Sequence, residues 1–167
     1  SFFNKLGASI GERTFCNATA SKAFRMVAGP SSGVDPESFA EADVIIMWGI
    51  NTLSTSMHHS RFVIEAMNKG AIFVVIDPVR TRTARRAHHH MQPKPGTDVV
   101  LAMAIANFLI EENLVDMDYV RNHTLGFDDF SERARQFSLE YAHEVTGVPV
   151  QEIRDLARLM VNNKAVA

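Results

Sequence analysis

The chain has 167 residues, of which 46% are hydrophobic and 22% are charged, and its formal net charge is −2 at pH 7. This balance gives no electrostatic reason to expect a nucleic acid or an anionic membrane surface as a partner. No apolar run reaches the roughly 20 residues that a membrane helix needs, so direct membrane insertion is not expected. A single cysteine excludes an internal disulfide and a self-contained iron–sulfur or cysteine zinc site.

The first strand is predicted at residues 44–48, after a region with few structural signals. Residues 21–26 are expected to form a short helix with Ser21 as its N-cap. Asp35 followed by Pro36 is typical of the start of another brief helix. The run Val44-Ile45-Ile46-Met47-Trp48 then predicts a strand that ends in Gly49-Ile50-Asn51.

A second strand is predicted at residues 71–76, directly after a helix at 57–68 that Gly70 terminates. This run is continuous and rich in β-branched residues, as in a parallel strand that is buried on both faces. It ends abruptly in Asp77-Pro78. Two such strands joined by a helix form the right-handed crossover of a doubly wound sheet.

The rest of the chain is expected to add one more strand and then to be helical. We predict a short basic helix at 81–87, a third strand near 88–92, and helices at 99–112, 116–122, 127–137, 139–145 and 149–162. The fold class is therefore α/β, with a Rossmann-like doubly wound, mostly parallel sheet, flanking helices and a helical C-terminal part. Because both ends look cut, residues 1–167 are expected to form a single domain of a larger multidomain polypeptide.

Asn51 and Asp77 are the first candidate binding residues, because each follows a predicted parallel strand. Open α/β sheets bind nucleotides at the carboxyl ends of their strands. A carboxylate there can accept two hydrogen bonds from a ribose diol or from the N–H pair of guanine, and an amide can serve the adjacent sugar or phosphate. In the alternative reading, Asp77 caps a turn before Pro78 and Asn51 only accommodates an unusual backbone conformation.

The segment Pro95-Gly96-Thr97-Asp98 predicts a tight turn that leads into a helix. Its backbone amides favour an anion, and Asp98 can accept hydrogen bonds from the donor edge of a base. A proline–glycine turn with a helix N-cap at Thr97 or Asp98 would explain the same four residues without a ligand.

Three further groups of side chains are weaker candidates for a functional role. The four arginines in or directly before the short basic helix could clamp a pyrophosphate, although most of them are expected to face solvent (Arg80, Arg82, Arg85 and Arg86). The histidines at 88–90 follow one another in a strand, so they point to alternate faces and cannot converge on one metal ion. Cys16 is either a small buried side chain or a thiolate ligand for a soft metal, and the polar turn that follows it favours an exposed side chain.

The order and spacing of several short motifs resemble the molybdopterin oxidoreductases of the dimethyl sulfoxide reductase family. The resemblance runs from Cys16 to the end of the chain, and no one motif carries it alone. The motifs are Trp48-Gly49-Ile50-Asn51, Val75-Ile76-Asp77-Pro78, Thr83-Ala84, Pro95-Gly96-Thr97-Asp98, Asp116-Met117-Asp118-Tyr119-Val120, His123-Thr124-Leu125-Gly126-Phe127, Thr146-Gly147-Val148-Pro149 and Ile153-Arg154-Asp155-Leu156-Ala157.

The resemblance implies two molybdopterin guanine dinucleotides around a molybdenum or tungsten ion. Cofactor contacts are implied for six residues of this chain (Asn51, Ser54, Asp77, Arg80, Gly96 and Asp98). Cys16 stands at the position of the catalytic metal ligand. An iron–sulfur cluster, the other cofactor-binding domains and electron-transfer subunits are expected outside these residues.

The chain departs from the family pattern at two positions. Val79 replaces the basic residue that often follows Asp-Pro, and Arg80 comes one place later. Asn17 replaces the histidine that follows the metal ligand in the formate dehydrogenases of the family, which argues against formate as the substrate.

Two alternatives to a molybdenum oxidoreductase remain open from the sequence. The first is a nucleotide-binding module without molybdenum, against which the lack of a G-x-G-x-x-G fingerprint weighs for nicotinamide cofactors. The second is a structural piece that has no activity of its own when it is isolated.

Overall fold

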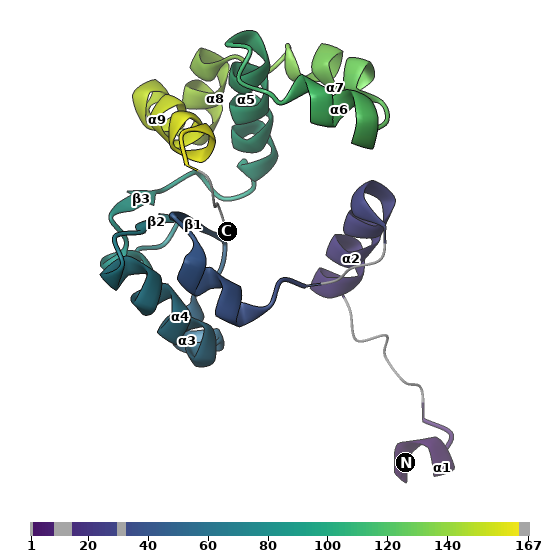
Figure 1. Cartoon of the computed structure of the whole chain (residues 1–167). Helices are drawn as coiled ribbons and strands as arrows, with labels where there is room; N and C mark the ends of the chain where they lie inside the picture. Colours follow the sequence, from purple (N-terminus) through teal and green to yellow (C-terminus); the bar gives the residue numbers. More distant parts are fainter. Residues whose placement is uncertain (1, 9–14, 30–32, 164–167) are drawn as a thin grey trace. The chain divides into compact units, whose positions relative to one another are not determined.

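The computed structural model describes residues 2–8, 15–29 and 33–163. The chain divides into two compact units, Ser1–Asp35 and Pro36–Ala167. The described part of the first unit contains helices α1 (Phe2–Lys5) and α2 (Phe15–Ala28) (Figure 1).

The second unit alternates strands and helices in its first half and is helical in its second half (Figure 1). Its elements in chain order are η1 (Pro36–Glu41), β1 (Val44–Trp48), α3 (Thr52–Thr55), α4 (Met57–Asn68), β2 (Ile72–Ile76), η2 (Ala84–Arg86), β3 (His89–Met91), α5 (Asp98–Glu111), α6 (Met117–His123), α7 (Phe127–Ala134), α8 (Leu139–Thr146) and α9 (Val150–Val161), where η marks a 3₁₀ helix.

The three strands of the second unit form a parallel sheet in the order β1-β2-β3. Trp48 pairs with Ile76, and Ile76 pairs with Met91, so the last residues of the three strands are in register. The central strand β2 is buried from Phe73 to Ile76, as its run of apolar residues predicts. The sheet therefore presents a single carboxyl edge.

Hydrophobic clusters cover both faces of this sheet. Helix α4 covers one face (Figure 1). Its Val63 and Ala66 pack there against side chains of β1 and β2. Helices α5, α8 and α9 lie on the other face (Figure 1). Side chains of these helices pack there against Val74, Ile76 and Met91. Alternate residues of β2 thus face different helical layers, which confirms the predicted α/β fold with flanking helices.

Some local predictions were wrong at the ends of elements. Ser21 lies inside α2 rather than at its start, and its hydroxyl donates to Asn17 Oδ1 over 3.2 Å. The predicted basic helix at 81–87 is reduced to the single turn η2, and the segment after Asn51, for which no helix is predicted, contains the short helix α3. These segments are short or lack a regular apolar period, so periodicity could not place their ends.

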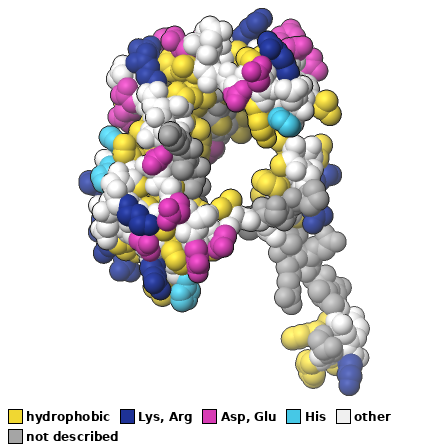
Figure 2. All heavy atoms as spheres, viewed as in Figure 1, with side chains coloured by type: hydrophobic (Ala, Val, Ile, Leu, Met, Phe, Trp, Pro, Cys, Tyr) yellow, Lys and Arg dark blue, Asp and Glu magenta, His cyan; other side chains and the backbone are white. Residues whose placement is uncertain are grey.

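The surface of the second unit agrees with the near-neutral composition. Basic and acidic side chains are interspersed on the face seen in Figure 2 rather than gathered into one block. Among the helices within the described ranges, none combines the length and the apolar character needed to cross a bilayer.

Helix α5 allows a direct test of which side chains hold the second unit together. Leu101 is fully buried, whereas Val99, half a turn away on the same helix, is 70% exposed. We expect Leu101→Ala to lower the free energy of unfolding by about 2–5 kcal/mol, because it leaves a cavity beside the sheet. Val99→Ala should change it by about 0.5 kcal/mol or less. Urea denaturation measures both, and equal losses for the two variants would contradict this description of the core.

Candidate functional site

The strand register brings the candidate residues of three segments to one edge of the sheet. The Gly49 N–H donates to the Ile76 carbonyl over 2.8 Å, and the Asp77 N–H donates to the Met91 carbonyl over 3.0 Å. Gly49 has φ +66°, a left-handed conformation that lets the chain leave β1 at the edge. Asn51 follows two residues later and Asp77 directly follows β2, so both side chains start from the carboxyl edge. We call this region the carboxyl rim.

Asn51 has a fixed orientation because its side chain bonds to Thr83. The Thr83 hydroxyl donates to Asn51 Oδ1 over 2.7 Å and accepts the Leu53 N–H over 3.1 Å. Thr83 is only 2% exposed, so its hydroxyl proton needs an acceptor within the protein. The Asn51 oxygen fills that need. The Asn51 amide nitrogen bonds to no other described residue and remains available as a donor at the rim.

The Asp77 carboxylate stabilises a turn and still has acceptor positions for further hydrogen bonds. Its Oδ1 accepts the Val79 N–H over 2.8 Å, which is the turn that the structural alternative predicted. The side chain is half-buried, and an ionised carboxylate has about four acceptor positions. The turn uses one of them, so stabilising the turn and binding a ligand are compatible roles for Asp77.

Asp98 is the first residue of α5, and Trp48 from the end of β1 holds it. The Trp48 indole N–H donates to Asp98 Oδ1 over 2.7 Å. The predicted N-cap at Thr97 or Asp98 is confirmed at Thr97, although the Thr97 hydroxyl donates to the Lys94 carbonyl over 2.7 Å and not to the first turn of α5. The exposed Asp98 carboxylate is therefore hydrogen-bonded to the end of β1. Its Oδ2 atom bonds to no other residue in the described part of the chain, so it can accept a further hydrogen bond.

Gly96 shapes the turn that leads into α5. Its φ is +81°, and a Cβ atom built on it would meet nothing within 4 Å. The backbone conformation, and not a close neighbour, therefore requires glycine here. The turn is closed by the Thr97 N–H, which donates to the Lys94 carbonyl over 3.2 Å.

The remaining candidates differ in their relation to the rim. Ser54 lies exposed in α3, and Arg80 lies exposed in the loop after Asp77. The arginines at 82, 85 and 86 are exposed as well, as expected for a mostly solvated group. Cys16 belongs to α2 in the other unit, and its side chain lies outside the described residues.

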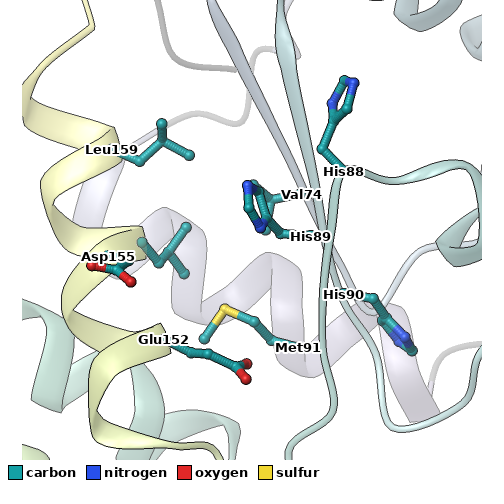
Figure 3. A pocket seen from close by; sticks show the side chains of 9 residues that line it. Val74, His88, His89, His90, Met91, Glu152, Asp155 and Leu159 are labelled. Carbon is teal, nitrogen blue, oxygen red and sulfur yellow. The ribbon is translucent and has the colours of Figure 1, made fainter.

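The three histidines of the β3 region point in different directions (Figure 3). His88 Nδ1 accepts the Phe73 N–H over 2.8 Å, and His90 Nε2 donates to the Asp77 carbonyl over 2.9 Å. His89 faces a cavity of about 500 Å³ between β3 and α9 (Figure 3). In the part of the chain that the structure describes, no three His, Cys, Asp or Glu residues are grouped as a metal site would require.

Sequence reasoning missed the two residues that orient the rim. The sequence analysis places Trp48 at the apolar end of a strand and Thr83 in a short helix, and it includes both in motifs of the resemblance without a contact for either side chain. Neither role has a periodic signal, because each depends on a contact between segments 30 or more positions apart, Leu53 with Thr83 and Trp48 with Asp98. Their presence in the motifs Trp48-Gly49-Ile50-Asn51 and Thr83-Ala84 is the available sequence signal.

The fold and its carboxyl rim define a class of protein: a parallel α/β domain with polar side chains at the strand ends, where such sheets bind ligands. A family profile described as molybdopterin oxidoreductase matches residues 1–160. The chain therefore belongs to the molybdopterin oxidoreductase family, and its relatives include members of the dimethyl sulfoxide reductase group.

Individual relatives agree with this assignment. The chain is 37% identical over 158 residues to a probable oxidoreductase, YoaE, of Bacillus subtilis, a match that covers 95% of the chain and 23% of the relative. It is 33% identical over 139 residues to the dimethyl sulfoxide/trimethylamine N-oxide reductase of Rhodobacter capsulatus, covering 74% of the chain and 17% of that protein. The chain thus spans less than a quarter of the length of these relatives.

A solved structure has the same fold over nearly the whole chain. The acetylene hydratase of Pelobacter acetylenicus superposes with a TM-score of 0.84 and 25% identity, covering 99% of this chain and 23% of that one. The agreement extends the family assignment from sequence to fold.

Thr83 can be tested as the residue that fixes Asn51. We expect Thr83→Val to lower the free energy of unfolding by about 1–3 kcal/mol, because it leaves Asn51 Oδ1 and the Leu53 N–H without their partner. Thr83→Ser retains the hydroxyl and should cost about 1 kcal/mol or less. Chemical denaturation of both variants gives the comparison, and a serine variant as unstable as the valine variant would refute a role for the hydroxyl.

Proposed function

We propose that the chain is the α/β domain that binds a guanine dinucleotide in a molybdenum or tungsten oxidoreductase. Family membership and the gathering of Asn51, Asp77, Gly96 and Asp98 at one edge support this proposal. The single most informative observation is the shared register of the three strand ends, because it gives ligand-binding side chains a common platform. The same family match disfavours a nucleotide-binding module unconnected with molybdenum.

The donor and acceptor groups of the rim fit a guanine nucleotide. Guanine presents N1–H and an exocyclic amine, both donors, and the ribose presents hydroxyls. The available oxygens of Asp77 and Asp98 are acceptors for such groups. The Asn51 amide nitrogen and the backbone N–H groups at the start of α5 are donors, which suits sugar and phosphate oxygens.

Within the complete protein, this domain binds and orients and does not itself break bonds. When bound, the metal and its pterin dithiolenes supply the change of oxidation state that accompanies transfer of an oxygen atom or a hydride equivalent. Asp77 and Asp98 hold the sugar and base, and Asn51 holds the adjacent sugar or phosphate. Ser54 and Arg80, which are exposed beside the rim, supply secondary contacts to the same ligand.

The proposal extends to the whole cofactor and to the rest of the protein. Two molybdopterin guanine dinucleotides surround the metal, and residues 1–167 act as one domain that encloses one of the two nucleotide ends. Other domains of the polypeptide supply the remaining walls, and electron-transfer subunits exchange electrons with it. The isolated domain is inactive, because it can hold only one end of such a ligand.

Loss of either carboxylate should reduce cofactor loading. We expect Asp77→Ala and Asp98→Ala, made in the complete protein that carries this chain, each to weaken guanine nucleotide binding about 10- to 100-fold, as expected for loss of a charge-assisted hydrogen bond. Elemental analysis of molybdenum or tungsten and calorimetry with GDP measure the effect. Asp129→Ala, an exposed aspartate on α7, serves as the control. Full metal content and unchanged GDP affinity in both rim variants would contradict the proposal.

Cys16 is proposed as the thiolate that binds the metal and tunes its chemistry. We expect Cys16→Ala to abolish turnover while most of the metal is retained, because the dithiolene sulfurs still hold it. X-ray absorption spectroscopy should then show about one sulfur neighbour fewer around the metal. Ser21→Ala, further along α2, is the matched control. An unchanged sulfur count in Cys16→Ala would exclude Cys16 as a ligand.

A further inference from the structure

Trp48 joins the hydrophobic core to the carboxyl rim through one hydrogen bond. Its ring is half-buried and packs against the cluster that contains Ile76, Met91 and Leu101. Its indole N–H leaves that cluster and donates to Asp98 Oδ1 over 2.7 Å. A side chain packed against the core thus directs its only polar side-chain atom at an exposed carboxylate.

This bond restricts what Asp98 can do. An indole N–H is a donor only, so the carboxylate oxygen that it contacts acts as an acceptor. An exposed aspartate otherwise samples several rotamers, and each ligand contact would have to restrict that freedom. Trp48 occupies one of about four acceptor positions and anchors Oδ1, which restricts the rotamers of Asp98 and leaves both oxygens with capacity for a further donor.

We propose that Trp48 is the positioning residue that sets base specificity at the rim, by holding Asp98 so that its two oxygens receive the paired N–H donors of guanine. This inference rests on the proposed function, and it adds how the site distinguishes guanine from a base that lacks the exocyclic amine. Hypoxanthine provides the comparison, because it differs from guanine only by that amine. A fixed carboxylate discriminates more strongly than a mobile one, since a mobile one can reorient to the single remaining donor.

The geometry separates this role from simple packing. Tryptophan and phenylalanine both fill an apolar site with an aromatic ring, so packing does not require the indole nitrogen. Trp48→Phe removes the donor and leaves a ring at the same place in the cluster. A packing role predicts equal effects on all nucleotides, whereas a positioning role predicts an effect on the difference between two bases.

The test measures GDP and IDP affinity by calorimetry in the complete protein that carries this chain, prepared without its cofactor. We compare the wild type, Trp48→Phe, Asp98→Asn and the double variant. The wild type is expected to prefer GDP over IDP about tenfold or more. Trp48→Phe should reduce this preference about fivefold with IDP affinity almost unchanged, and Asp98→Asn should remove it. In the Asp98→Asn background, Trp48→Phe should have no further effect.

The outcomes distinguish this inference from the proposed function. A wild type that binds GDP and IDP equally overturns the assignment of guanine to the rim. If the wild type prefers GDP but Trp48→Phe keeps that preference, or weakens GDP and IDP binding equally, the role of Trp48 is overturned. The assignment of guanine to the rim then stands. Asp98→Glu provides a second measurement if Trp48→Phe does not fold: it keeps the charge, moves the carboxylate from the position that Trp48 fixes, and should lose the preference.

Discussion

The parallel register of three strands is the constraint on which the rest of the second unit depends. Because Trp48, Ile76 and Met91 lie side by side, every segment that follows a strand starts from the same edge. The register is strongly specified, since β2 is buried on both faces and a shift by one residue would exchange the side chains that face α4 with those that face α5. Burial of the apolar side chains of β2 thus determines where the polar residues that follow the strands lie at the edge of the sheet.

The architecture could be predicted from the sequence because its signals are local and strong. The run that ends at Ile76 and the helix that ends before Gly70 both follow from the order of apolar residues. The placement of Asn51 and Asp77 at one edge follows from the parallel pairing of two such runs. The start of α2 and the contraction of the basic helix to η2 could not be predicted, because short or weakly periodic segments carry little pattern.

The chemistry of the rim could be predicted only in part, because the decisive contacts join distant segments. The sequence indicates that Asn51 and Asp98 are polar groups at the edge, but not which atoms of each remain available. Thr83 engages the oxygen of Asn51 and leaves its nitrogen, and Trp48 engages one oxygen of Asp98 and leaves the other. These two bonds give the rim a donor and an acceptor in defined positions, and they arise from tertiary packing that no local period reveals.

Trp48 is the only tryptophan among the 167 residues. Its ring lies in the apolar cluster while its N–H contacts a solvent-exposed carboxylate, so the excited state of the indole senses both environments at once. The emission wavelength and intensity of this single fluorophore therefore depend on whether Asp98 is solvated or covered. These 167 residues therefore carry an intrinsic fluorophore at the carboxyl rim, with no second indole among them to obscure its signal.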